Sequence, residues 1–106
     1  MLKSKIKDYY KKRGLKWPKN SWQALGWLHS EIGEVYELLQ AREGGWVRNN
    51  PDEHDEFARE RLAEELGDCV MMLYVAGIVE GVDIEQGLLD KMERKLAEPS
   101  GGHKLA

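Results

Sequence analysis

The sequence predicts an all-α domain with four helices. Apolar residues recur at intervals of three and four, and no stretch of strand-like alternation is long enough to compete. Capping patterns and Gly or Pro stops divide the chain into four segments. A chain of 106 residues has room for one domain. We expect that domain to span residues 1–99 and the tail, residues 100–106, to be disordered.

The first helix is expected over residues 2–13, where lysines separate an apolar stripe made of Leu2, Ile6, Tyr9 and Tyr10. Gly14 is placed to stop it. Residues 15–19 form a connector, because Pro18 disfavours helical geometry in the residue before it.

A second helix opens at residues 20–23, which resemble a capping box, and is expected to run to about Arg42. Its predicted core stripe is Leu25, Leu28, Ile32, Val35 and Leu39. The segment 43–51 is rich in Gly, Asn and Pro and is expected to be a loop. Trp46 in this loop has two interpretations: a lid residue folded over the helices, or a stacking surface for a nucleobase.

A third helix is expected from about Glu53 to Glu80, with Asp52 as its cap and Gly81 as its stop. The predicted core positions are Phe57, Leu62, Leu66, Cys69, Leu73 and Gly77, and the adjoining stripe holds Arg61, Glu65, Asp68 and Met72. From Cys69 onward this helix is apolar on all sides, which predicts self-association through the segment 70–79. A second capping box at residues 83–86 opens the fourth helix, which Pro99 ends.

Composition excludes several function classes. The net charge is -3, and the basic residues at the two ends are separated by acids, which does not suggest a surface for DNA or RNA duplexes. The single Cys69 cannot form an intrachain disulfide, which fits a reducing, cytoplasmic location. The longest apolar run, residues 69–79, is shorter than the roughly 20 residues needed to span a bilayer. No secretory signal pattern precedes Trp17.

Two matching motifs carry the strongest functional signal. Residues 31–35 and 65–69 each read acid, large aliphatic, Gly, acid, apolar, so each motif sets two acids three residues apart on a helix face. If the helices pack together, Glu31, Glu34, Glu65 and Asp68 form a cluster that needs a cation. Oxygen ligands favour Mg²⁺ or Mn²⁺. The glycines between the acids predict close approach of backbone or ligand. The alternative is two ordinary solvated faces in an acid-rich chain.

On these motifs, together with the later Gly81-Val82-Asp83 helix start and Lys91-Met92, the chain resembles the MazG-like all-α nucleoside triphosphate pyrophosphohydrolases. The resemblance covers about residues 20–97 and includes a likeness to the dCTP pyrophosphatase-like branch. The chain departs from the family pattern at Ser30 and Lys95. The resemblance implies a four-helix MazG-like bundle completed by homo-oligomerisation, as a homodimer or homotetramer.

The resemblance also implies an activity, namely Mg²⁺-dependent hydrolysis of a (deoxy)nucleoside triphosphate between the α- and β-phosphates. The products would be a nucleoside monophosphate and pyrophosphate. The four acids would hold the ion, with Glu34 and Glu65 acting in catalysis. For the nucleotide we expect contacts from Lys91, Lys95, Trp22 and Trp46. Trp22 and Lys95 have equally simple alternatives, a core staple and a solvated surface residue.

Two other functions compete with this one. Phosphoribosyl-ATP pyrophosphohydrolase would use the same helical metal scaffold on a different substrate. A non-enzymatic helical interaction module would leave the acids solvated and use the apolar third helix to dock a partner.

Overall fold

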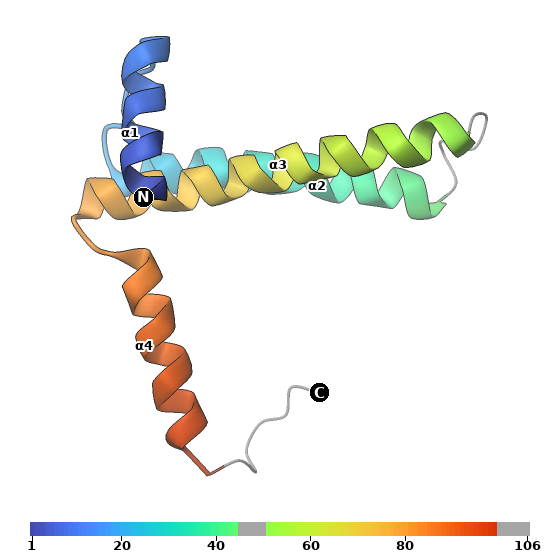
Figure 1. Ribbon diagram of the computed structural model, residues 1–106. Coiled ribbons are helices and arrows are strands. Elements are labelled where there is room, and N and C mark those ends of the chain that lie inside the picture. The colour runs from blue at the N-terminus through green and yellow to red at the C-terminus, as the bar shows by residue number, and fades with distance from the viewer. Residues whose placement is uncertain (45–50, 100–106) are drawn as a thin grey trace.

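The computed structural model describes the backbone of residues 1–44 and 51–99, and the side chains of residues 1–41 and 59–99. Four helices follow one another, and the described residues contain no strand, so the predicted all-α class is confirmed (Figure 1). Their bounds are α1 Leu2–Arg13, α2 Ser21–Gly44, α3 Pro51–Glu80 and α4 Ile84–Ala97. The loop that carries Trp46 and the predicted disordered tail lie outside the described residues.

Helix α1 begins and ends where the sequence predicts, and α2 begins where it predicts. Gly14 closes α1 in the left-handed conformation, with φ 66°, which a residue without Cβ adopts at little cost. At the start of α2 the Asn20 side chain accepts a hydrogen bond from the Gln23 N–H at 2.8 Å. The Gln23 side chain in turn accepts from the Lys19 N–H at 2.7 Å, so donors at this helix end are satisfied reciprocally.

The corner between α3 and α4 is built from local hydrogen bonds. Gly81 takes φ 74°, and the Val82 N–H donates to the Gly77 carbonyl at 2.9 Å. Asp83 then caps α4 by accepting from the Gln86 N–H at 2.9 Å. These hydrogen bonds satisfy backbone groups at the end of α3 and at the start of α4 within a few residues. They also fix the direction in which α4 leaves the corner.

The boundaries around the loop differ from those expected. Helix α2 runs to Gly44 instead of about Arg42, and α3 already starts at Pro51 instead of about Glu53. Asp52 therefore lies in the first turn and is not the residue before the helix. Pro is well suited to a first helical position, because the N–H it lacks has no partner there.

A small core lies where α1 crosses the antiparallel pair α2 and α3, which we call the hairpin (Figure 1). The Tyr10 ring stacks on Trp17 of the connector at a centroid distance of 4.6 Å, and its hydroxyl lies 3.8 Å from the Met72 sulfur. The buried core residues are Ile6, Tyr10, Ala24, Leu28, Met72 and Val75. Burial at this crossing holds the N-terminal segment against α3, far away in the sequence.

The predicted core stripes are only partly correct. On α2, Leu28 and Val35 are buried as expected, but Leu25 and Ile32 are 45% and 51% exposed. On α3, Gly77 is buried, whereas Leu66 and Leu73 are exposed and the neighbouring stripe provides the core through Met72 and Val75. Three further predicted positions, Leu39, Leu62 and Cys69, are half-buried, and the Phe57 side chain is outside the described residues. The hairpin therefore packs on faces rotated from those that hydrophobicity alone selects.

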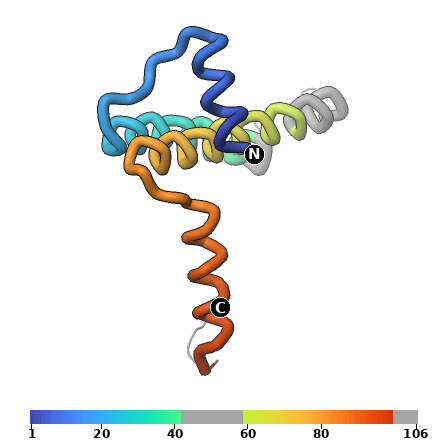
Figure 2. The backbone as a smooth tube through the Cα atoms, turned by 60° about the vertical axis from the view of Figure 1, so that its left-hand side comes forward, coloured from blue at the N-terminus to red at the C-terminus, as the bar shows by residue number. Residues whose placement is uncertain are grey.

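Helix α4 extends away from the hairpin and buries none of its residues (Figures 1 and 2). The radius of gyration is 17.6 Å, well above the roughly 13 Å of a compact chain of about 100 residues. The chain thus has the outline of an L, with the hairpin as one limb and α4 as the other. Of the helices described, none combines the length and the apolar character that crossing a bilayer requires.

Candidate metal centre

The antiparallel pairing of α2 and α3 brings three of the four motif acids together. Glu31 comes from α2, and Glu65 and Asp68 come from α3 one turn apart. One carboxylate oxygen from each of these three lies within 4.8 Å of the other two. The spacing places both α3 acids on the face that meets α2, so packing of the hairpin alone builds the triad.

Within the triad, one oxygen is buried and has no hydrogen-bond partner. Glu65 Oε2 is shielded from solvent, and no described donor bonds to it. Burying a carboxylate oxygen without a donor is unfavourable by roughly 1–3 kcal/mol or more. A bound cation would remove that penalty, and the donor set of three carboxylates suits a hard divalent ion such as Mg²⁺ or Mn²⁺. The residues present therefore fit such an ion.

Within the part of the chain that the structure describes, the charges that act on Glu31 are all negative. Partial burial raises the pKa of Glu31, and the negative charges of Glu34, Asp68 and Glu65 raise it further. Burial also raises the pKa of the Cys69 thiol, with a further contribution from the same four acids. Glu31 and the neighbouring Cys69 thiol consequently lie in the field of the same motif carboxylates.

The remaining acid, Glu34, lies outside the triad and is exposed. The two motif glycines do not explain the cluster. A Cβ built on Gly33 or on Gly67 would meet no other group within 4 Å, so the expected close approach of backbone is wrong for the single chain. Both glycines leave open space beside the acids.

Of the residues expected to contact a nucleotide, the three that the structure describes are not gathered at the triad. Trp22 is 83% exposed, which excludes the core-staple alternative, and it lies roughly 13 Å along the α2 axis from Glu31. Lys91 and Lys95 lie on α4, which points away from the hairpin (Figure 2), and Lys95 pairs with Glu98 at 3.4 Å. Trp46 lies outside the described residues.

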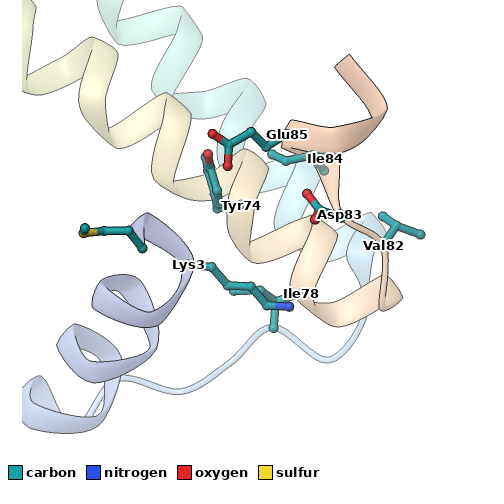
Figure 3. Close-up of a pocket in the computed structure, with 8 residues that line it drawn as sticks. Lys3, Tyr74, Ile78, Val82, Asp83, Ile84 and Glu85 are labelled. Carbon is teal, nitrogen blue, oxygen red and sulfur yellow. The ribbon is translucent and has the colours of Figure 1, made fainter. Parts of the chain in front are cut away.

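Sequence reasoning overlooked two features. One is the position of Cys69 beside the acids, which its place next to Asp68 and four residues after Glu65 would have indicated. The other is a hollow of ≈ 140 Å³ at the corner of α1, α3 and α4 (Figure 3). Its lining comes from three separate segments, so no local pattern predicts it, and it shares no residue with the triad.

Comparison with known proteins adds no assignment: a scan against family models, a search of curated proteins and a search of solved structures each return no match for this chain.

Proposed function

We propose that the protein is a divalent-metal-dependent hydrolase that splits a (deoxy)nucleoside triphosphate between its α- and β-phosphates, releasing a nucleoside monophosphate and pyrophosphate. The observation that carries this proposal is the triad of Glu31, Glu65 and Asp68, with its buried, unpartnered oxygen. The resemblance of the two acid motifs and of Lys91-Met92 to MazG-like enzymes supports the same reaction class.

The chemistry suits the residues present. Phosphoanhydride hydrolysis needs neutralisation of phosphate charge and an oriented water more than it needs a protein nucleophile. A bound Mg²⁺ supplies that neutralisation. Glu31, Glu65 and Asp68 would hold it with part of its coordination left to water, because Mg²⁺ accepts few protein groups.

Two acids have roles beyond holding the ion. Exposed Glu34 lies one turn from Glu31, where its carboxylate can accept a hydrogen bond from the attacking water and orient it. Glu65 carries the buried oxygen that has no hydrogen-bond partner, and in this proposal that oxygen binds the ion, so Glu65 would fix the geometry of the site. Lys91 and Lys95 then serve as point charges for the phosphates, which requires that α4 of another copy bring them to the acids.

The test is a panel of nucleotides with Mg²⁺ or Mn²⁺, with the products identified. Release of pyrophosphate and a monophosphate from a nucleoside triphosphate supports the proposal. Turnover of phosphoribosyl-ATP with none of the ordinary triphosphates would replace the substrate while keeping the site. No pyrophosphate from any nucleotide, together with a melting temperature that millimolar Mg²⁺ does not shift, would favour the helical interaction module.

A matched pair of variants separates the site from general charge effects. Glu65→Gln should abolish pyrophosphate release, because it removes a triad charge while retaining the side-chain shape. The neighbouring exposed Glu64 is not among the acids that act on Glu31, so Glu64→Gln should retain activity. Equal loss in both variants would mean that net charge, not the triad, governs the reaction.

A further inference from the structure

The N-terminal part of the chain concentrates positive charge. Half of the 16 Lys and Arg residues lie within residues 1–19, whereas all but one of the 19 Asp and Glu residues lie beyond them. These basic side chains are all exposed, and none forms an ion pair with a carboxylate that the structure describes. We call this set the basic surface; it comprises Lys3, Lys5, Lys7, Lys11, Lys12, Arg13, Lys16 and Lys19. Such a concentration of like charge is unfavourable in the free protein and is relieved when an anionic partner binds.

The packing of α1 leaves most of this charge accessible. Ile6 and Tyr10 are buried against the hairpin, so the other sides of α1 face solvent. Helical spacing sets the lysines of α1 in two rows beside this buried stripe, with Lys3, Lys7 and Lys11 in one row and Lys5 and Lys12 in the other. In both views α1 and α4 leave the hairpin on opposite sides (Figures 1 and 2). The basic surface is therefore separate from the lysines of α4.

Three aromatic rings form a continuous row beside these cations. The ring of Trp17 stacks on Tyr10 with an interplanar angle of 12°, and Tyr9 meets Tyr10 edge-on at a centroid distance of 6.3 Å. We call these three residues the aromatic row. Its outer members, Tyr9 and Trp17, are 45% and 39% exposed. Because the rings restrict one another, they can stack on a further planar group at a low cost in conformational entropy.

Cations flank the exposed rings. Lys5 lies one turn before Tyr9 on α1, and Lys12 and Arg13 follow Tyr9 by three and four residues, so all four share one side of the helix. Lys16 directly precedes Trp17. Surfaces that bind single-stranded nucleic acids combine these two parts: bases stack on aromatic rings, and phosphates interact with the cations between them.

We infer that the basic surface and the aromatic row bind single-stranded nucleic acid, with bases stacked on Tyr9 and Trp17 and phosphates held by the surrounding lysines. A duplex fits less well, because its bases are stacked on one another and present no free face to the rings. A lipid surface also fits less well, since Ile6 and Tyr10, which would have to insert, are already buried against the hairpin. The site shares no residue with the acid triad, so binding does not depend on the proposed hydrolysis.

Fluorescence anisotropy of labelled oligonucleotides, measured with the full chain, tests this binding. A single strand of about 12 nucleotides should bind with a dissociation constant on the order of 1–100 μM at physiological salt. DNA and RNA strands of the same sequence are compared, and tighter binding of one of them identifies the natural strand. A duplex and a base-free polyphosphate of similar length should each bind at least about tenfold more weakly, because neither offers free base faces.

Matched variants separate stacking from charge. Tyr9→Leu keeps an apolar side chain beside Tyr10 and should weaken binding of the single strand about tenfold. Tyr36→Leu makes the same change at an exposed tyrosine of α2 and should bind as the parent does. Lys12→Gln should reduce the slope of log K against log salt by about 0.7, the contribution of one phosphate contact to a single strand. Arg94→Gln removes one charge from exposed α4 and should leave the slope unchanged.

A parent that binds no single strand overturns the inference, and so does polyphosphate or duplex binding as tight as that of the single strand. Binding to phosphatidylserine vesicles in place of the strand would also overturn it and would assign the basic surface to a membrane. If Tyr9→Leu loses the helical circular dichroism of the parent, the comparison of the single strand with polyphosphate and the salt slope of Lys12→Gln decide instead. An unchanged slope in Lys12→Gln would contradict the placement of phosphates on α1.

Discussion

Replacing Glu65 by Gln should raise the stability of the metal-free protein and abolish its response to metal. The substitution keeps the side-chain shape and removes one of three negative charges whose oxygens lie within 4.8 Å of one another. Two like-charge pairs are relieved, with Glu31 and with Asp68. At the dielectric constant of water, the repulsion within each pair destabilises the folded state by about 1 kcal/mol at this separation. The dielectric constant of water is appropriate because the site is only half-buried, and salt reduces the repulsion further.

The expected gain is therefore about 1–2 kcal/mol without metal, which corresponds to an increase in melting temperature on the order of 5–10 °C for a chain of this size. With Mg²⁺ the parent should instead be more stable than the Glu65→Gln variant. A parent saturated to 100 times its dissociation constant gains roughly 2.7 kcal/mol, whereas the variant gains little.

Thermal melting followed by circular dichroism, with EDTA or with a Mg²⁺ titration, measures both effects. Protein concentration must be held constant, since association also shifts the midpoint. Glu64→Gln is the control and should show the parental Mg²⁺ response. A Glu65→Gln variant that responds to Mg²⁺ as the parent does, or that melts below the parent without metal, would contradict the assignment of Glu65 to the metal site.

Three further outcomes follow from the described geometry. Gly77→Ala should destabilise the protein by about 1–3 kcal/mol, because its Cβ would lie 2.7 Å from the Ile84 Cγ2. Gly33→Ala has open space around its Cβ and should stabilise the protein by about 0.5–1 kcal/mol. Denaturant midpoints of the two variants measure both effects. The pKa of Glu31 is raised above 4.5, so in EDTA the folded state retains a proton that the unfolded state has lost, and stability should decline as pH rises from 4.5 through the folded-state value. Glu31→Gln should flatten that decline, and an unchanged slope would contradict the assignment. Burial and the acids raise the pKa of Cys69, so iodoacetamide at pH 8 should modify the native thiol more slowly than the thiol in denaturant, and equal rates would show that the thiol is not shielded.

Local signals in the sequence predicted the elements well. Gly14, Asn20, Gly81 and Asp83 each act at a helix end through bonds to groups a few residues away, so the necessary information is contained in one segment. Asp52 is a strong capping residue and so predicts too late a start for α3, whereas Pro51 at the first helical position is the better signal.

The inward faces were less predictable, because they depend on which partner covers them. Hydrophobicity ranks Leu66 and Leu73 above Met72, yet in the single chain α1 and α2 cover Met72 and leave the two leucines exposed. Because α3 is apolar on all sides, its sequence pattern does not show which neighbour covers which face of the helix.

At the candidate site, the triad was predictable and its surroundings were not. The repeated spacing of the acids was enough to put Glu31, Glu65 and Asp68 on facing helices. The positions of Lys91 and Lys95 depend on the direction that the corner gives to α4, and that direction is set by three-dimensional contacts such as the one between Gly77 and Ile84. The sequence motif therefore identified residue types without showing which of them meet within one chain.

The packing of α1 on α3 has a consequence for the order of folding. Helices α2 and α3 are consecutive, so their pairing closes a short loop and can form quickly, whereas the contact between Tyr10 and Met72 joins groups 62 positions apart. Closing that larger loop carries an additional entropic penalty and becomes favourable once the hairpin offers a surface. Docking of the N-terminal segment is then a late step. Tyr10→Ala should accelerate unfolding and leave the folding rate nearly unchanged, the pattern of a contact absent from the transition state.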